Sequence, residues 1–254
     1  MYISKMTVYD RLMTAYQKKG AGYWVLLDPD KMPISAIAAF VAAAEKSGVD
    51  ALLVGGSLML SSDFEHFVTE LKKNVTQIPV IIFPGSLQQI TAQADALLFL
   101  SVVSGRDAHN LIGNHVLAAP LVYRSKLETI STAYLLIESG RITAAQFMSG
   151  SLPLPRNKPD LAVAHALAAQ YLGFKLIYLE AGSGAELSVP AEIITAVSQT
   201  CNIPVIVGGG IRTPQDASAK VKAGASFVVT GNIIEDTTDL DLLNEFAKAI
   251  HTKI

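Results

Sequence analysis

The sequence predicts an α/β protein built as one (β/α)₈ barrel, the TIM-barrel architecture, as a single domain over residues 1–254. Eight short apolar runs follow one another, mostly separated by amphipathic segments, and no Pro- or Gly-rich linker divides them. Eight alternating units fit a closed barrel better than an open sheet. The runs cover residues 23–27, 51–54, 79–83, 96–100, 133–137, 175–179, 204–207 and 227–229.

Composition narrows the class of protein. Half of the 254 residues are hydrophobic and only 17% are charged, so the chain can bury a large core. The formal net charge of −2 provides no basic field for nucleic acid. No apolar run reaches the roughly 18 residues that a membrane span needs. Cys201 is the only cysteine, and Lys5, Asp10 and Arg11 interrupt any signal-like N-terminus, so we expect a reducing, cytoplasmic location.

The helices are predicted from apolar residues on one face and from their end signals. Residues 7–18 place Val8, Leu12 and Tyr16 on one side and end before Gly20. Another helix begins near Pro33 and ends at Gly48. Residues 85–93, after the third apolar run, are too few for a regular helix. The remaining helices are predicted at residues 63–73, 108–118, 159–172, 190–200, 214–223 and 240–250.

A barrel gathers its functional residues at the carboxyl ends of its strands. This rule brings to one mouth a set of residues that are scattered in the sequence: Asp28, Ser57, Tyr178, Glu180, Gly209, Gly210, Gly231 and Asn232.

The loop after the seventh run predicts a phosphate site. It contains three consecutive glycines, Gly208 to Gly210, and leads to Thr213 and Pro214, which are typical of the first positions of a helix. Backbone amides and a helix N-terminus attract phosphate, and Gly231 and Asn232 after the eighth run would form the second wall. The alternative is that the glycines only permit tight turns.

The segment from Tyr178 to Gly184 predicts the chemistry. Glu180 would accept a proton from a hydroxyl, Tyr178 would orient that hydroxyl, and the amides of 182–184 would bind phosphate, so a phosphorylated alcohol is the expected substrate. In the alternative interpretation, Glu180 is a solvated loop carboxylate beside an ordinary turn.

Asp28 is the best candidate for a metal ligand. Mg²⁺ takes one or two carboxylates together with water and phosphate oxygens, so Asp28 with the Ser57 hydroxyl would suffice; alternatively, Asp28 caps the following helix. The five histidines show no metal spacing. No nucleophile elbow, dinucleotide fingerprint or Walker loop occurs.

Residues 153–159 form a proline-rich loop after the fifth run, and Arg156 and Lys158 lie within it. These cations either contact a diphosphate at the mouth or are solvated loop charges.

Six segments, taken in order, resemble the geranylgeranylglyceryl phosphate synthase family over nearly the whole chain. They are LDPDK at 27–31, VGGS at 54–57, PLPRNKP at 153–159, YLEAGSG at 178–184, VGGGIR at 207–212 and TGN at 230–232. Each motif alone is unspecific, whereas the ordered set is specific.

The resemblance implies a modified TIM barrel without a regular third helix, which agrees with residues 85–93. It implies an Mg²⁺-dependent prenyltransferase of phospholipid biosynthesis. The enzyme would join the 3-hydroxyl of sn-glycerol 1-phosphate to a prenyl diphosphate, expected to be geranylgeranyl diphosphate, and release diphosphate. It also implies a homo-oligomer, and the lipidic donor and product suggest transient membrane contact.

Carried over by position, the resemblance assigns the metal to Asp28 and Ser57 and catalysis to Glu180 and Tyr178. The implied glycerol phosphate site comprises Tyr178, Leu179, Glu180, Ala181, Gly182, Ser183, Gly184, Gly209, Gly210, Gly231 and Asn232. Some bacterial heptaprenyl-transferring members have a lysine where this chain has Leu26, which agrees better with the archaeal-like branch.

Two other hypotheses remain at this point. One is a phosphosugar isomerase or aldolase that shares only the phosphate site, although no second acid/base or Schiff-base lysine is obvious at a strand end. The other is a non-catalytic protein that binds a phospholipid or phosphometabolite. For a prenyl chain, Phe83, Phe99 and Tyr134 are candidate groove residues that would serve equally well as barrel core.

Overall fold

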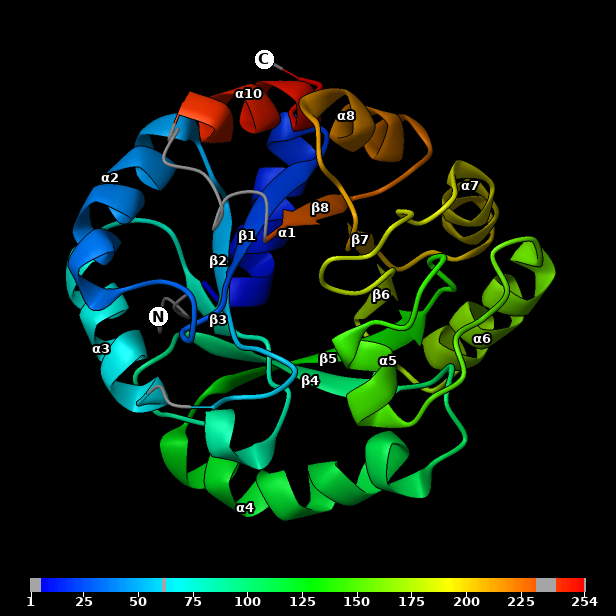
Figure 1. Ribbon diagram of the computed structural model, residues 1–254, viewed down its shortest axis with the longest axis horizontal. Coiled ribbons are helices and arrows are strands. Elements are labelled where there is room, and N and C mark those ends of the chain that lie inside the picture. Colours follow the sequence, from blue (N-terminus) through cyan, green and yellow to red (C-terminus); the bar gives the residue numbers. More distant parts are fainter. Residues whose placement is uncertain (1–5, 61–62, 232–240, 254) are drawn as a thin grey trace, which may run out of the picture.

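The computed structural model, which describes residues 6–60, 63–231 and 241–253, is a closed barrel of eight parallel strands in chain order. Figure 1 looks along the barrel, with the helices arranged around it. This is the predicted fold, and every predicted apolar run overlaps a strand. The strands are β1 Gly22–Leu27, β2 Ala51–Val54, β3 Val80–Ile82, β4 Ala96–Val102, β5 Glu128–Leu136, β6 Leu176–Glu180, β7 Val205–Gly208 and β8 Phe227–Thr230.

The helices outside the barrel form where amphipathic segments meet capping residues. Thr7, for example, accepts a hydrogen bond from the Asp10 backbone and begins α1, and Gly20 ends it in the left-handed conformation. The α-helices of the described residues are α1 Val8–Lys19, α2 Ile37–Ser47, α3 Phe64–Asn74, α4 Asn114–Ser125, α5 Ala144–Ser149, α6 Pro159–Tyr171, α7 Ala191–Thr200, α8 Pro214–Lys222 and α10 Asp241–Ile250.

Strand residues alternate between two cores. Tyr23, Val25 and Leu27 face the surrounding helices, whereas Trp24 faces the barrel interior, where its ring centroid lies 4.4 Å from that of Phe227. Because these strands are buried on both sides, they read as continuous apolar runs rather than as alternating patterns.

Helix α1 closes the barrel at the amino ends of the strands, opposite their carboxyl ends. Val8 and Leu12 pack into the interior core with Trp24. The amides of Val8 and Tyr9, at the first turn, donate to the Glu128 carboxylate at 2.6 and 2.9 Å. Since Glu128 is the first residue of β5, it anchors the positive end of the helix to the barrel.

The segment after β3 has no α-helix, as predicted. It contains only a 3₁₀ turn, η2 Leu87–Gln89. Buried Gln89 connects the loops after β2 and β3, because its amide nitrogen donates to Gly56 O at 2.8 Å and its oxygen accepts from Gly85 N at 3.0 Å.

Three elements differ from the prediction. β5 begins at Glu128 rather than at residue 133, because its first half alternates polar and apolar residues and has no apolar run. The helix predicted at 108–118 starts with a π-helical turn, His109–Gly113, and α4 then continues past Pro120, which lies on the solvent side. The short helix α5 was not predicted. In the described part of the chain, no helix is long and apolar enough to cross a membrane.

Candidate active site

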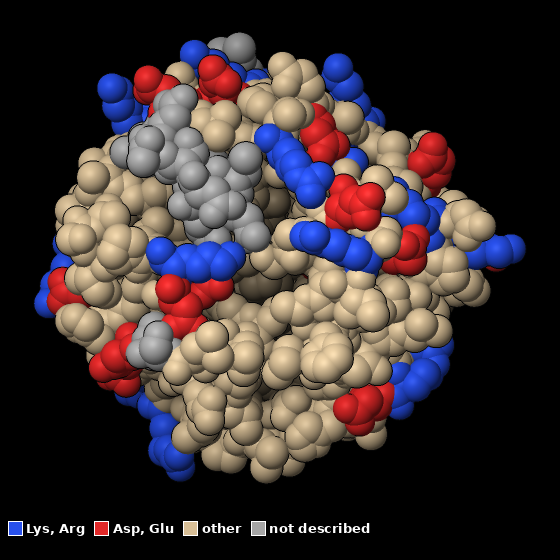
Figure 2. All heavy atoms as spheres, viewed as in Figure 1, with Lys and Arg blue, Asp and Glu red and all other residues tan. Residues whose placement is uncertain are grey.

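The carboxyl ends of the strands surround a cavity of about 730 Å³. Figure 2 shows it as the central hollow of this face, with charged side chains on its upper rim. Most of the predicted site residues line it together: Asp28, Ser57, Tyr178, Glu180, Ser183, Gly184, Gly209, Gly210 and Gly231. Leu179 and Ala181 instead pack in the outer core, Gly182 is buried behind the wall, and Asn232 lies outside the described residues.

Glu180 is the last residue of β6, and only 5% of it is exposed, so it is not a solvated loop carboxylate. Its Oε1 accepts from Gly182 N at 2.6 Å, and the Tyr178 hydroxyl donates to the same carboxyl group. Burial raises the pKa of Glu180 to about 7, against the lowering effect of these hydrogen bonds. A carboxyl group with this pKa is suited to receiving a proton near neutral pH.

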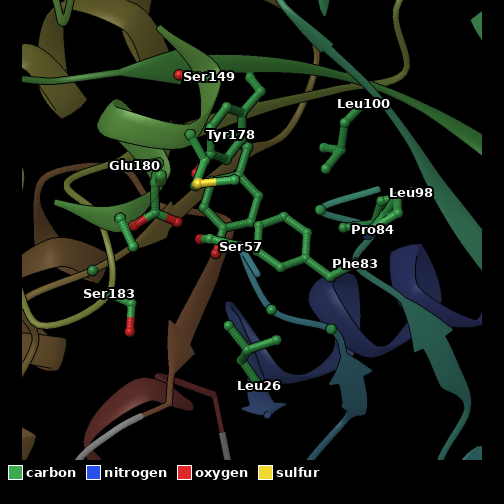
Figure 3. Close-up of a pocket in the computed structure, with 18 of the residues that line it drawn as sticks. Leu26, Ser57, Phe83, Pro84, Leu98, Leu100, Ser149, Tyr178, Glu180 and Ser183 are labelled. Carbon is green, nitrogen blue, oxygen red and sulfur yellow. The ribbon is translucent and has the colours of Figure 1, made fainter. Parts of the chain in front are cut away.

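Tyr178 stands inside an aromatic cluster. Its ring stacks on Phe83 with centroids 5.3 Å apart, and Tyr134 is tilted against it at 5.5 Å. In Figure 3, Phe83, Tyr178 and Glu180 follow one another across the pocket. Burial raises the pKa of the Tyr178 phenol well above its ordinary value, so this hydroxyl stays protonated and available as a donor.

Glycines at the end of β7 and in the loop after it make room for these two side chains. A Cβ on Gly208 would lie 2.4 Å from the Tyr178 hydroxyl oxygen, and one on Gly209 would lie 2.3 Å from Glu180 Oε1. Gly209 and Gly210 also have φ values of +82° and +70°, which L-residues rarely adopt. The glycines therefore do more than permit a turn, because they admit the acid and the tyrosine to the wall of the cavity.

The loop after β7 leads directly into α8, as predicted. Thr213 accepts a hydrogen bond from Asp216 N at 3.1 Å, and Pro214 is the first helical residue. Gly210 packs against the backbone of Ser188, where a Cβ would meet Ser188 N at 3.0 Å. The loops after β6 and β7 therefore meet backbone to backbone beside the cavity.

Asp28 and Ser57 lie on the opposite wall from Glu180's strand, after β1 and β2. Asp28 accepts from Asp30 N at 3.1 Å, and Lys31 Nζ lies 3.9 Å from its Oδ2. The backbone of Gly56 lies close to the Asp28 carboxylate, since a Cβ on Gly56 would lie 3.3 Å from Asp28 Oδ1. Burial raises the pKa of Asp28 from its ordinary range, and hydrogen bonding and Lys31 partly oppose this.

The residues at Asp28 fit Mg²⁺ only as a shared site. Among the described residues, no group of three or more His, Cys, Asp or Glu is arranged to hold a metal. One carboxylate and one hydroxyl match the way Mg²⁺ binds beside substrate phosphates, where the substrate and water supply the other oxygens.

The loop at 153–159 does not place its cations at the cavity. Arg156 donates from Nη1 to Glu138 O at 2.8 Å and from Nη2 to Ser188 O at 3.2 Å, and Lys158 is exposed at the start of α6. Neither side chain lines the cavity. The diphosphate contact considered for them therefore has no support, because Arg156 holds backbone carbonyls instead.

The sequence did not reveal four residues that shape the site. Arg141 and Arg212 line the cavity beside the loop after β6. Gln89 fixes the loop that contains Ser57 by donating to Gly56 O. Buried Thr143 packs against Gly182, since a Cβ on Gly182 would lie 2.3 Å from the Oγ1 of Thr143. Arg212 lies within a recognised motif, which was a usable signal, whereas the others have no local pattern.

The far part of the cavity is an apolar trench between β4 and α4, where a regular third helix would otherwise lie. Phe83 and Tyr134 line its entrance, and further in it is lined by Leu87, Ile90, Leu97, Phe99 and Ala118. The three aromatic residues proposed from the sequence therefore all reach this cavity.

Residues 14–250 of the chain match the PcrB family. The geranylgeranylglyceryl phosphate synthase of Chitinophaga pinensis is 41% identical over 244 residues, which cover 96% of each chain. The synthase of Methanosphaera stadtmanae is 40% identical and covers 90% of this chain and 93% of its own.

A solved structure agrees with these relatives. The (S)-3-O-geranylgeranylglyceryl phosphate synthase of Thermoplasma acidophilum, solved with its substrate sn-glycerol-1-phosphate, superposes with a TM-score of 0.91. It is 35% identical, and the match covers 97% of this chain and 99% of that one. The chain described here belongs to the PcrB family, that of the geranylgeranylglyceryl phosphate synthases.

Proposed function

We propose that this protein is a prenyltransferase that joins the 3-hydroxyl of sn-glycerol 1-phosphate to a prenyl diphosphate, of which geranylgeranyl diphosphate is the expected donor. The observation that carries the proposal is buried Glu180, with a pKa near 7, between a glycine-lined anion site and an apolar trench in one cavity. The related Thermoplasma acidophilum enzyme was solved with the same acceptor.

The acceptor is held by its phosphate. The turn at Ser183 and Gly184 and the loop at Gly209 and Gly210 form one wall, and Gly231 forms the other. This places the glycerol 3-hydroxyl toward Tyr178 and Glu180. Fixing the reacting groups in this way lowers the entropic part of the barrier.

The bond changes balance around Glu180. The glycerol oxygen forms a C–O bond to the allylic carbon as the bond from that carbon to the diphosphate breaks. The hydroxyl proton moves to the Glu180 carboxylate, and diphosphate leaves with the bonding electrons. Tyr178 keeps its own proton and orients the groups by hydrogen bonding.

Asp28 and Ser57 would hold Mg²⁺ together with the donor diphosphate. When bound, the metal supplies neutralisation of the negative charge that develops on the leaving group. The donor tail lies in the trench between β4 and α4, whose apolar walls replace water around an isoprenoid chain.

Incubating the purified protein with sn-glycerol 1-phosphate, Mg²⁺ and a mixture of C15 to C35 prenyl diphosphates tests the proposal. We expect mass spectrometry to detect a prenyl ether of glycerol phosphate and equimolar diphosphate, and no ether after chelation of the metal. Absence of any ether with every donor would refute the proposed reaction.

The two competing functions predict other outcomes. A Schiff-base aldolase needs a reactive lysine at the cavity. Among the described residues that line the cavity, Lys31 is the lysine that such an enzyme would use, and its Nζ lies 3.9 Å from Asp28. Conversion of phosphosugars would favour the isomerase or aldolase. Calorimetric binding of sn-glycerol 1-phosphate without turnover would favour a binding protein.

We also propose that the enzyme meets its lipidic substrate at a membrane surface through α4 and α5. Figure 2 shows few charged side chains over the lower part of this face. Large apolar residues there are exposed, namely Ile112, Val116, Leu117, Leu121, Phe147, Met148 and Leu152. Flotation with vesicles tests this contact, and loss of flotation in Phe147→Ser would assign it to this face. The family resemblance also implies a homo-oligomer, which sedimentation tests. The cytoplasmic location stays a prediction.

A further inference from the structure

The loop after β6 is held from outside by basic side chains. Four cations from other elements donate to its carbonyl oxygens. Arg141 donates to Gly184 O, Arg212 to Ala185 O at 2.7 Å and Glu186 O at 3.0 Å, Arg156 to Ser188 O at 3.2 Å, and Lys220 to Val189 O at 2.9 Å.

These four cations fall into two pairs. Arg141 and Arg212 line the cavity next to Ser183, Gly184 and Gly210, whereas Arg156 and Lys220 do not line it. Figure 2 shows basic side chains on the rim of the central hollow. A guanidinium group has five N–H donors in a planar fork, so the carbonyl bonds of Arg141 and Arg212 leave further donors for a ligand.

Arg141 and Arg212 supply the positive charge on the side of the cavity where the acceptor phosphate is proposed to bind. Among the residues that the structure describes, the ionisable side chains that line the cavity, apart from Tyr134, Tyr178 and His115, are Asp28, Lys31, Arg141, Glu180 and Arg212. Lys31 lies beside Asp28. The positive charge next to Gly184 and Gly210 therefore comes from Arg141 and Arg212, in a chain whose net charge is −2.

The turn between them is closed by its own hydrogen bond and by glycines. Ala185 N donates to Gly182 O at 3.1 Å, and Gly182 and Gly184 have φ values of +102° and +68°. Arg141 and Arg212 bind the carbonyls at the end of this turn, so they fix its position relative to the loop at Gly210.

We propose that Arg141 and Arg212 form a phosphate clamp, which fixes the turn at 182–185 and adds charge-assisted hydrogen bonds to a phosphate monoester. The clamp deepens the proposed function and rests on its acceptor. Arginine suits both parts of this role because its fork binds carbonyl and phosphate oxygens at once.

Calorimetry with inorganic phosphate tests the clamp, using the full chain and the variants Arg141→Gln, Arg212→Gln, Arg212→Lys and Arg156→Gln. Arg156→Gln is the matched control, because it removes an arginine from a carbonyl of the same loop but outside the cavity. We expect Arg141→Gln and Arg212→Gln to raise the Kd of phosphate about 10- to 100-fold. Arg212→Lys should raise it about 3- to 10-fold, because it keeps the charge but not the fork, and Arg156→Gln less than about threefold.

A kinetic measurement separates binding from loop structure. In the two cavity variants, the KM of sn-glycerol 1-phosphate should rise in the same proportion as the Kd, while kcat and the KM of the prenyl diphosphate stay within about threefold.

Two results would overturn the clamp. One is phosphate binding of wild-type strength in both Arg141→Gln and Arg212→Gln; the other is an equal loss in Arg156→Gln. If Arg212→Gln does not fold, Arg212→Lys with unchanged Kd is equally decisive. A wild-type protein that binds phosphate but forms no ether would refute the proposed function and leave the clamp standing.

Discussion

Glu180 is the residue on which the proposed chemistry depends, and its ionisation should be visible in the rate. Burial raises its pKa to about 7, so it is protonated, and inactive as a base, below neutral pH. We therefore expect kcat/KM to rise with pH and to level off above a midpoint near 7. The measurement is a pH–rate profile at saturating Mg²⁺.

Tyr178→Phe identifies the group that titrates. The Tyr178 hydroxyl lowers the pKa of Glu180, so its removal should move the midpoint above 7. The second ionisation of the acceptor phosphate, with a pKa of about 6, does not change with the variant. A midpoint that stays in place in Tyr178→Phe would assign the profile to the substrate rather than to Glu180.

Gly209→Ala should damage the site more than its backbone strain alone explains. The new Cβ would lie 2.3 Å from Glu180 Oε1 and 2.5 Å from Gly182 N. The Glu180 carboxylate must move to relieve these clashes. We expect kcat/KM to fall by about two orders of magnitude or more, because the base is then misplaced relative to the substrate. Gly173→Ala is the control, since Gly173 has a similar φ of +86° but open space around it, and it should cost only about 1 kcal/mol of stability. Equal activity in the two variants would contradict this account.

Sequence reasoning predicted which residues stand at the strand ends but not their surroundings. Asp28 and Glu180 were placed correctly because each directly follows a short apolar run, and Tyr178 because it lies near the end of one. The burial of Glu180 was not predictable, because its neighbours come from several segments. Gly209 lies against its Oε1, and Tyr178, which donates to it, is itself packed by Phe83, just after β3, and by Tyr134 of β5. Neither role left open for Arg156 included its bonds to Glu138 O and Ser188 O, because these carbonyl partners are distant in sequence.

At the scale of elements, the absence of a helix after β3 makes room for the proposed donor site. The 3₁₀ turn η2 covers less of the sheet than a helix would, and the trench between β4 and α4 occupies the space. The short length of residues 85–93 predicted this gap. The helix boundaries around α4 were not predictable, because a π-helical turn and an internal proline break the usual end signals.

Ala118→Trp should shorten the donor that the enzyme accepts. Ala118 is 5% exposed on the inner face of α4 and lines the trench, so an indole group there would fill its far part. We expect the product distribution from mixed donors to move toward the shorter chains by about tenfold or more, because each excluded isoprenoid loses its apolar burial. Ala119→Trp, on the exposed side of the same helix, is the control. An unchanged distribution in Ala118→Trp would place the tail elsewhere.

At the scale of the whole molecule, the barrel separates stability from chemistry. The cavity lies at the carboxyl ends of the strands. The opposite end of the barrel is closed by α1, which Glu128 anchors. Alternating faces of the same strands build both cores, which is why eight apolar runs sufficed to predict the architecture.

Glu128→Ala should weaken the fold and spare the reaction. It removes the acceptor of the Val8 and Tyr9 amides, so the free energy of unfolding should fall by about 1–3 kcal/mol. The KM of both substrates should not change, because the cavity lies at the other end. Denaturant unfolding and steady-state kinetics measure the two effects. Glu70→Ala, which removes a surface ion pair with Lys73, is the control and should lower the free energy of unfolding less than Glu128→Ala does.

The most direct test of the account compares the wild-type protein with Glu180→Gln in an assay for the ether product. Both proteins receive sn-glycerol 1-phosphate, Mg²⁺ and geranylgeranyl diphosphate, and product is quantified by mass spectrometry. We expect product from the wild-type protein, and from Glu180→Gln a rate lower by about two orders of magnitude or more with an unchanged affinity for the acceptor. Product formed by Glu180→Gln at the wild-type rate would contradict the central claim that the buried carboxylate receives the proton.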